Sequence, residues 1–162
     1  MFGKSRFGWV IGLVALMVVF WMRDREGGGR EAPDFRLTSY LGKSLTLSRL
    51  EGEKGAMLVF LASWCEVCNS EIPSIRRFAD ESAGDVFVCG IDIEEDRQTV
   101  SAFAYRKSID FPLLLDGDGS VAKRYRVISI PTFIGIDKSG RVVYRGHELP
   151  RDTESLIDKL NS

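Results

Sequence analysis

From about residue 34 onwards, apolar residues occur in two alternating patterns. Residues 56–62 (AMLVFLA) and 86–93 (VFVCGIDI) are apolar runs of the length of buried strands. Residues 66–81 instead place apolar side chains at helical spacing. The same reasoning predicts further strands at 35–37, 44–47, 113–115, 132–137 and 141–145, and further helices at 95–107, 120–126 and 153–160. Strands that alternate with helices predict an α/β fold whose sheet is covered on both faces.

A different apolar segment precedes this domain. Residues 7–22 (FGWVIGLVALMVVFWM) carry no charge and are flanked by Arg6 and Arg23. A helix of this length covers roughly 24 Å, and the flanking basic side chains can extend outward to lengthen the span. No small-residue cleavage site follows the run, so one uncleaved transmembrane helix is favoured over a cleaved signal peptide. The basic residues on its two sides are nearly balanced and do not decide its orientation.

Composition and charge narrow the class of protein further. Residues 26–33 hold three successive glycines and a proline among charged residues, which predicts a flexible linker. Residues 34–162 then have the length of a single domain. The chain has 22 basic and 23 acidic residues, so its charge gives no support for nucleic acid as a partner. We therefore expect an anchor at 7–22 followed by one globular domain.

Two of the three cysteines lie where disulfide exchange needs them. Cys65 and Cys68 form a C-x-x-C pair after the run 56–62 and at the start of the predicted helix 66–81. Unpaired N–H groups and the macrodipole at a helix N-terminus favour a thiolate, which is the nucleophile in disulfide exchange. Cys68 lies one turn later, where it can attack a mixed disulfide and release the product. The pattern predicts a redox pair in which Cys65 attacks and Cys68 resolves.

The third cysteine and the single histidine bear on a rival interpretation. A C-x-x-C pair can also be half of a zinc site, but only Cys89 and His147 could complete it, and neither belongs to a second paired motif. Cys89 lies within the run 86–93, where a core position is favoured. His147 follows a glycine after the last predicted strand, where a solvated turn is favoured. We expect no metal site and no bound cofactor.

Further motifs follow in order along the chain. They are F-x-L at 35–37, G-K-S-L-T-L-S at 42–48, W-C-E-V-C at 64–68, Glu71 with Pro73, a strand–helix segment between about 86 and 126, and I-P-T at 130–132. Together these residues resemble the thioredoxin superfamily, and within it the membrane-anchored TlpA/ResA-type thiol–disulfide oxidoreductases linked to cytochrome c maturation. The resemblance covers nearly all of 33–162. It implies a thioredoxin-like fold with an inserted strand–helix segment.

The resemblance also implies roles for residues near the pair. Pro131 would form a cis peptide bond with Ile130, and both would lie beside the cysteines and contact the substrate. Glu71, one helical turn after Cys68, would be a partly buried carboxylate that transfers protons. A solvated surface glutamate is the alternative at this position.

Trp64 and Glu66 flank Cys65. We expect Trp64 to shield the pair and contact partners, while a half-buried packing aromatic is an equally open interpretation. The charge of Glu66 would oppose thiolate formation at Cys65, or it simply suits a helix N-terminus. Thioredoxin has a buried acid at the position of Val59, and the TlpA/ResA-type family that this sequence resembles often has proline at the position of Val67. This sequence departs from both. Their redox potentials are therefore not carried over.

These predictions favour an enzyme that exchanges disulfides with protein substrates through transient mixed disulfides. The resemblance implies a single-pass cell-membrane protein with an extracytoplasmic (periplasmic) domain, fed by a membrane electron donor and reducing substrates such as apocytochrome c. Two alternatives stay open. A peroxiredoxin-like peroxidase would need threonine or serine three residues before Cys65, where Ala62 stands. A thioredoxin-fold copper chaperone would need C-x-x-x-C spacing and a distant histidine, for which only His147 is available.

Overall fold

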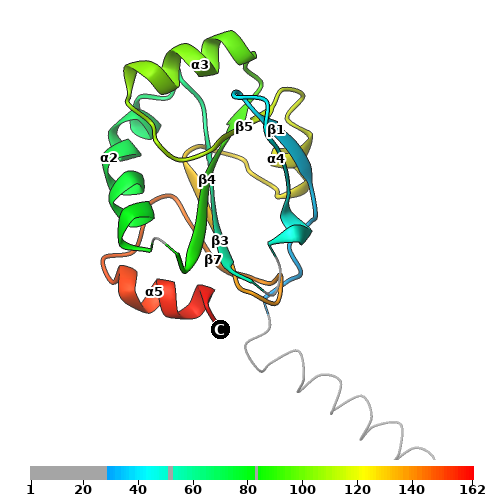
Figure 1. The fold of residues 1–162 in the computed structure, drawn as a ribbon, viewed down its shortest axis with the longest axis vertical. Helices are drawn as coiled ribbons and strands as arrows, with labels where there is room; N and C mark the ends of the chain where they lie inside the picture. Colours follow the sequence, from blue (N-terminus) through cyan, green and yellow to red (C-terminus); the bar gives the residue numbers. More distant parts are fainter. Residues whose placement is uncertain (1–28, 51–52, 83) are drawn as a thin grey trace, which may run out of the picture.

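A seven-stranded mixed sheet runs through the domain, with helices on both of its faces (Figure 1). The computed structural model describes residues 29–50, 53–82 and 84–162, so the predicted anchor at 7–22 lies outside the described residues. The strands are β1 (Arg36–Ser39), β2 (Ser44–Thr46), β3 (Gly55–Leu61), β4 (Val86–Ile93), β5 (Leu113–Asp116), β6 (Thr132–Ile136) and β7 (Val142–Gly146). The helices are the 3-10 turn η1 (Leu47–Arg49), α2 (Glu66–Glu81), α3 (Arg97–Arg106), α4 (Ser120–Arg124) and α5 (Thr153–Leu160). Within the described part of the chain, no helix is long and apolar enough to cross a membrane.

The strand order places β3 inside the sheet. The order is β2-β1-β5-β4-β3-β6-β7, in which β3, β4 and β5 are parallel while β1, β6 and β7 run antiparallel to their neighbours. Every residue of β3 is buried, which explains its uninterrupted apolar sequence. Leu61 at the end of β3 pairs with Asp92 of β4. The carboxyl ends of these two strands therefore form one edge, and the chain enters α2 from it.

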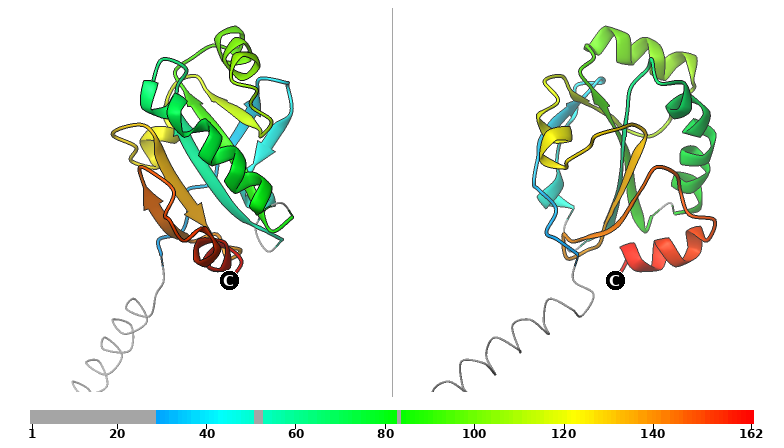
Figure 2. Two further views of the ribbon diagram at one scale, coloured as in Figure 1. Left: turned by 90° about the vertical axis from the view of Figure 1, so that its left-hand side faces the viewer. Right: turned by 180° about the vertical axis from the view of Figure 1, so that it is seen from behind.

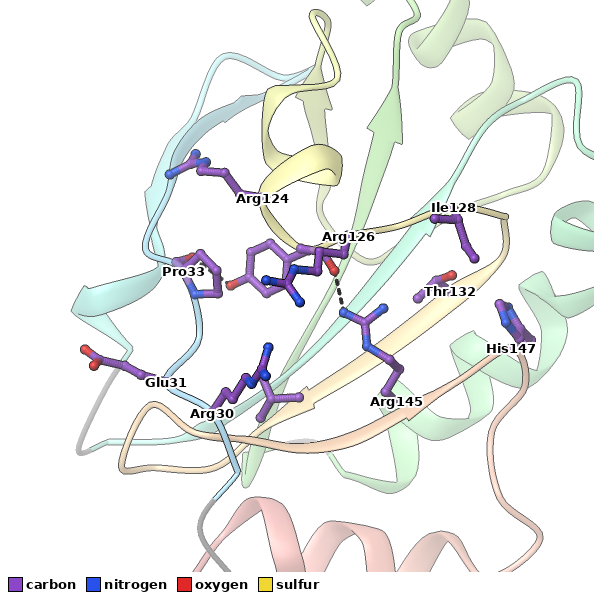
Figure 3. A pocket seen from close by; sticks show the side chains of 11 residues that line it. Arg30, Glu31, Pro33, Arg124, Arg126, Ile128, Thr132, Arg145 and His147 are labelled. Atoms are coloured by element: carbon purple, nitrogen blue, oxygen red, sulfur yellow. Dashed lines mark hydrogen bonds between the residues drawn. The ribbon is translucent and has the colours of Figure 1, made fainter. Parts of the chain in front are cut away.

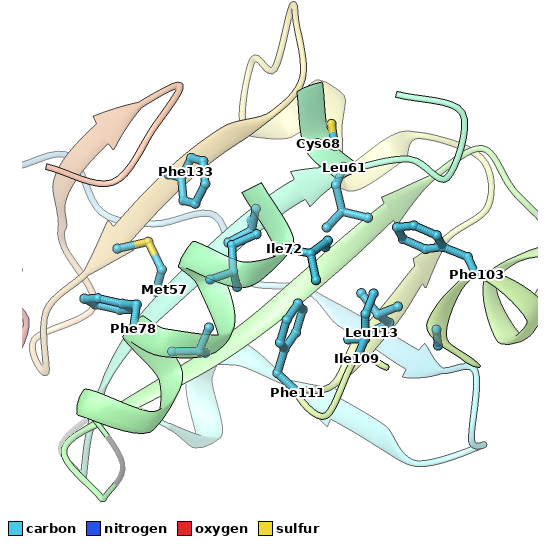
Figure 4. Packing of buried hydrophobic residues seen from close by; sticks show 14 of the residues in the cluster. Met57, Leu61, Cys68, Ile72, Phe78, Phe103, Ile109, Phe111, Leu113 and Phe133 are labelled. Carbon is cyan, nitrogen blue, oxygen red and sulfur yellow. The ribbon is translucent and has the colours of Figure 1, made fainter. Parts of the chain in front are cut away.

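Alternate side chains of β3 enter two separate cores, because successive residues of a strand point to opposite faces. Met57, Val59 and Leu61 pack under α2, α3 and α5, and Figure 4 shows side chains of α2 above this layer. Leu58 and Phe60 pack on the other face, against α4 and η1. Figure 2 shows the helices on the two faces of the sheet from two further sides. The predicted thioredoxin-like α/β fold, with a sheet covered on both faces, is confirmed.

The predicted elements agree with the structure to within a few residues at each end. The helices at 66–81 and 153–160 and the strand at 86–93 have the predicted bounds. The helix expected at 95–107 begins only at Arg97, because Asp96 is its N-cap and accepts a hydrogen bond from the Thr99 N–H at 2.8 Å. The strand expected at 44–47 ends one residue earlier, at Thr46. Leu47 instead begins the 3-10 turn η1, which was not predicted.

The linker expected at 26–33 needs a correction at its C-terminal end. The Arg30 carbonyl accepts a hydrogen bond from the Val142 N–H at 2.9 Å, and the Ala32 N–H donates to the Gly140 carbonyl at 2.8 Å. Ala32 is also buried. These bonds pair the segment with the start of β7, so the ordered domain already includes residues 30–33.

Candidate active site

Cys65 and Cys68 lie where β3 ends and α2 begins, and they form a disulfide in this structure. Cys65 is the N-cap of α2, and its Sγ accepts a hydrogen bond from the Cys68 N–H at 3.1 Å. The first N–H groups of a helix have no carbonyl partner within that helix, so they are available to the sulfur. The predicted placement of the pair at the helix start is confirmed.

The two cysteines differ in exposure. Cys65 keeps 7% of its surface exposed, whereas Cys68, in the first turn of α2, keeps 1% and belongs to the apolar cluster on that face of the sheet (Figure 4). In the reduced protein, the helix dipole and the Cys68 N–H would both stabilise a thiolate at Cys65. A substrate sulfur can therefore reach Cys65, while Cys68 is reached through Cys65.

Ile130 and Pro131 form the other wall of the site. Their peptide bond is cis, as the resemblance implied. The Sγ of Cys65 lies 3.8 Å from the Ile130 carbonyl oxygen. Pro131 is buried and Ile130 is partly exposed, so a segment that approaches Cys65 meets Ile130 first.

Trp64 and Glu66 lie on the outer side of the pair. Trp64 is 70% exposed, which excludes the half-buried packing role and leaves its ring free to contact a partner. It lines a hollow of about 460 Å³ together with Ile130 and Ile128. Glu66 is exposed in the first turn of α2, a position that the helix dipole favours for an acid.

Glu71 lies in α2 one turn after Cys68 and is partly exposed. Its carboxylate makes no hydrogen bond or ion pair with another described residue. The position agrees with the expected partial burial, and its proton-transfer role stays a prediction.

Asp92 is a buried acid that the sequence reasoning missed. It is fully buried at the end of β4, and neither carboxyl oxygen accepts a hydrogen bond from a described residue. Because it pairs with Leu61, its side chain lies on the sheet face that α2 covers. Loss of hydration and the negative charge of Glu95 raise the pKa of Asp92 from 3.8 to about 8. Near neutral pH Asp92 is therefore largely protonated and can donate a hydrogen bond to Glu95.

Glu95 connects Asp92 to the loop before the cysteines. Its carboxylate accepts hydrogen bonds from the Ser63 N–H at 2.5 Å and the Ser63 hydroxyl at 2.6 Å. The Asn69 side-chain amide in turn donates to the carbonyls of Ser63 and Cys65, both at 3.0 Å. Hydrogen bonds thus lead from Glu95, whose negative charge acts on Asp92, to the backbone of the redox pair.

Cys89 and His147 lie where the sequence predicted. Cys89 is a free thiol in the core, and burial raises its pKa to about 12, so it stays unreactive. His147 is exposed after β7, and its Nδ1 lies 2.8 Å from the Pro131 carbonyl oxygen. Among the residues that the structure describes, no group of three or more His, Cys, Asp and Glu side chains is arranged to hold a metal ion.

Sequence comparison places the chain among known oxidoreductases. Residues 28–145 match the family model described as the AhpC/TSA family. The thiol–disulfide oxidoreductase ResA of Geobacillus kaustophilus is 34% identical over 135 residues, which cover 82% of this chain and 77% of that protein.

Solved structures agree with this placement. A candidate protein disulfide isomerase from Bacteroides thetaiotaomicron is 35% identical, with a TM-score of 0.71 over 82% of this chain and 87% of its own. A secreted disulfide oxidoreductase of Mycobacterium tuberculosis, homologous to DsbE of E. coli, is 27% identical, with a TM-score of 0.65 over 78% and 93% of the two chains. With its disulfide pair at the start of α2, this chain belongs to the AhpC/TSA family and is a thioredoxin-like thiol–disulfide oxidoreductase.

Proposed function

We propose that the chain reduces protein disulfides outside the cytoplasm while residues 7–22 anchor it in the cell membrane. The observation that carries the proposal is the unequal exposure of Cys65 and Cys68 at the N-terminus of α2. The uncharged run at 7–22 supports the anchor. The resemblance to TlpA/ResA-type proteins supports reduction as the direction, with apocytochrome c as one substrate.

In this proposal each cysteine takes one step of the exchange. The Cys65 thiolate attacks one sulfur of the substrate disulfide; that S–S bond breaks, and the other substrate sulfur leaves as a thiolate. Cys68 then loses its proton and attacks the Cys65 sulfur, which releases the second substrate thiol. The substrate gains two electrons and two protons, and the enzyme keeps a Cys65–Cys68 disulfide. A dithiol donor in the membrane would reduce this disulfide for the next cycle.

The second step needs a group that accepts the Cys68 proton, because that thiol is buried. Glu71 lies one turn after Cys68 in α2, and Asp92 lies on the sheet face that α2 covers. We propose Glu71 as the group that exchanges this proton with solvent, because it is partly exposed.

The two alternative activities find less support in this site. Ala62 is buried three residues before Cys65 and has no hydroxyl group to offer a peroxide. The His147 ring faces the Pro131 carbonyl, and the cysteines have redox spacing rather than the copper-chaperone spacing.

Replacing single cysteines tests the division of roles. In Cys68→Ser the attack is retained and the resolving step is lost, so covalent adducts between Cys65 and substrate proteins should accumulate. In Cys65→Ser few adducts should form. Non-reducing gels with mass spectrometry of the trapped species would show both results and identify the substrates.

Cys89→Ser is the matched control, because it also removes one thiol but from the core of the other sheet face. It should trap no more protein than the unmodified chain. Recovery of apocytochromes from Cys68→Ser would support the maturation role, whereas a broad set of secreted proteins would favour general disulfide repair. If Cys68→Ser traps nothing and both active-site variants keep full reductase activity, the pair is not the catalytic centre.

A further inference from the structure

A groove of about 660 Å³ opens on the face that carries α4 (Figure 3). Its described lining comes from residues 30–33, the end of α4 with the loop after it, the first residue of β6, and β7 with His147 after it. Four arginines are among the lining residues, and we call this hollow the arginine groove: Arg30, Arg124, Arg126 and Arg145 (Figure 3). Among the described residues that line the groove, Glu31 is the one acid.

The positive charge of this groove is not neutralised by neighbouring acids. The whole chain has 22 basic and 23 acidic residues, so four arginines beside one glutamate are a local excess. In the described part of the chain, the one ion pair is Arg76–Asp110, which lies elsewhere. None of the four guanidinium groups is therefore paired with a described carboxylate, and the groove presents a positive field to an approaching anion.

Two of the arginines are held in place by backbone carbonyls. Arg124 Nη1 donates to the Asp34 carbonyl at 2.6 Å, and Arg145 Nη2 donates to the Tyr125 carbonyl (Figure 3). A guanidinium has five N–H donors, so each of these groups is fixed by one bond and keeps others for a ligand. Fixed planar donors bind carboxylates well, because two N–H groups can meet the two carboxylate oxygens.

The groove is connected to the redox site along the protein surface. Ile128 lines both the arginine groove and the hollow beside Trp64, and its side chain is 96% exposed. The same hollow is lined by Ile130, whose carbonyl lies 3.8 Å from Cys65 Sγ. An extended polypeptide that brings a disulfide to Cys65 can therefore continue across Ile128 into the arginine groove.

We propose that the arginine groove binds an acidic segment of the substrate polypeptide, adjacent to the disulfide that Cys65 attacks. This inference rests on the proposed function, and it adds the chemical class of the substrate. Continuity with the redox site favours a polypeptide over a free anion. The arginines come from three segments along the groove, so they can meet successive carboxylates of one chain.

Two disulfide-linked peptides test the proposal with the full-length protein in detergent. They share the same residues around the disulfide and carry either glutamates or lysines in the flanking segment. The reduced enzyme should show a higher kcat/KM for the glutamate peptide. The preference should shrink as salt is raised, because exposed charge pairs are screened.

The variant Arg30→Glu/Arg126→Glu reverses two charges whose side chains make no hydrogen bond with another described residue. Its ratio of kcat/KM values, glutamate peptide over lysine peptide, should fall by about five- to twentyfold. Arg106→Glu/Lys107→Glu is the matched control, because it also reverses two positive charges, at the exposed C-terminal end of α3. It should leave the ratio and the basal activity unchanged.

The outcomes separate this inference from the proposed function. If both peptides are reduced at equal rates, or the double variant keeps the wild-type ratio, the arginine groove does not select substrates while the reductase activity stands. If neither peptide nor a small neutral disulfide is reduced, the proposed function itself fails. Reconstitution into phosphatidylcholine vesicles, with and without phosphatidylserine, tests whether the arginine groove contacts the membrane instead of the substrate. A variant effect that appears only with phosphatidylserine would identify the groove as a membrane contact and overturn the proposal.

Discussion

At the scale of single residues, Asp92 couples the stability of the domain to pH. The unfolded chain releases this proton near pH 3.8, whereas the folded chain keeps it to about pH 8, because the site is buried beside Glu95. Between these values the folded state binds more protons than the unfolded state. The free energy of unfolding therefore falls as pH rises through this window, by up to about 1.4 kcal/mol per pH unit from this group. Below about pH 3.8 Asp92 does not change the free energy of unfolding with pH, and above about pH 8 the decrease that it causes is complete.

The variant Asp92→Asn keeps the shape of the side chain and removes its titration. We expect the variant to be more stable than the wild type by a margin that grows between about pH 5 and pH 8. Urea unfolding of the oxidised full-length protein at several pH values would measure this margin. The oxidised form is used because its cysteine pair does not titrate.

A second buried aspartate provides the control. Asp116 at the end of β5 is as buried as Asp92, but its carboxylate accepts N–H groups of Val121 and Ala122 at 3.1 and 2.8 Å. Asp116→Asn should therefore lose roughly 1–3 kcal/mol of stability, while the titrating group Asp92 stays in place. An Asp92→Asn stability curve that runs parallel to the wild type would show that Asp92 does not titrate in this window.

The alternation of residues along the strand at 86–93 indicates on which face of the sheet Asp92 lies. In the run VFVCGIDI, Asp92 has the same parity as Val86 and Val88, so all three side chains belong to one sheet face. An acid near a strand end is ordinarily solvated. Only the cover from α2 and the pairing with Leu61 make this one buried, and both depend on contacts far away in sequence.

At the scale of elements, α2 shows what the sequence could predict and what it could not. Its bounds follow from local features: helical spacing of apolar residues, Glu66 in the first turn and the strand directly before it. The neighbours of each strand do not follow from local features. The pairing of β1 with β5 joins two short strands that no turn connects, and it depends on the assembly of the whole sheet. The site was predictable where it depended on the cysteine pair at the start of α2. It was missed at Glu95, which reaches it through a tertiary contact with Ser63, and at Asn69, whose side chain bonds to the Cys65 carbonyl one turn earlier in α2.

Helix α2 also carries Glu71, whose role can be separated from that of Asp92. If Glu71 exchanges the Cys68 proton, Glu71→Gln should slow disulfide turnover roughly tenfold to a hundredfold near neutral pH. It should also change the pH dependence of Cys65 alkylation in the reduced protein. Unlike Asp92→Asn, it leaves the buried acid Asp92 in place.

Asp80→Asn is the control for Glu71→Gln, since it neutralises an exposed acid near the other end of the same helix. Circular dichroism would establish that each variant is folded. Wild-type turnover and alkylation in Glu71→Gln would assign Glu71 to the solvated surface, and a turnover defect in Asp92→Asn alone would place the proton route through the buried acid.

At the scale of the whole molecule, the described chain begins at the end of the sheet opposite the redox pair. Arg30 bonds to Val142 at the start of β7, Val142 pairs with Ile136, and Ile136 pairs with Ala56 near the start of β3. The cysteines follow the other end of β3, roughly 17 Å further along the strand. The redox pair therefore lies at the end of the sheet remote from Arg30, on the side of the domain away from the residues that lead to the proposed anchor.

This arrangement leads to a prediction for the full-length protein in cells. The protein should sediment with membranes and resist carbonate extraction, and a tag after Ser162 should be digested by protease added outside the cytoplasmic membrane. Leu16→Arg places a charge in the middle of the run 7–22, which opposes insertion by about 2.5–3.5 kcal/mol, and should release part of the protein from the membrane. Leu16→Ile keeps the run apolar and should behave as the wild type. A mature soluble form that begins near residue 30, or a tag protected until the cytoplasmic membrane is broken, would contradict the anchored extracytoplasmic topology.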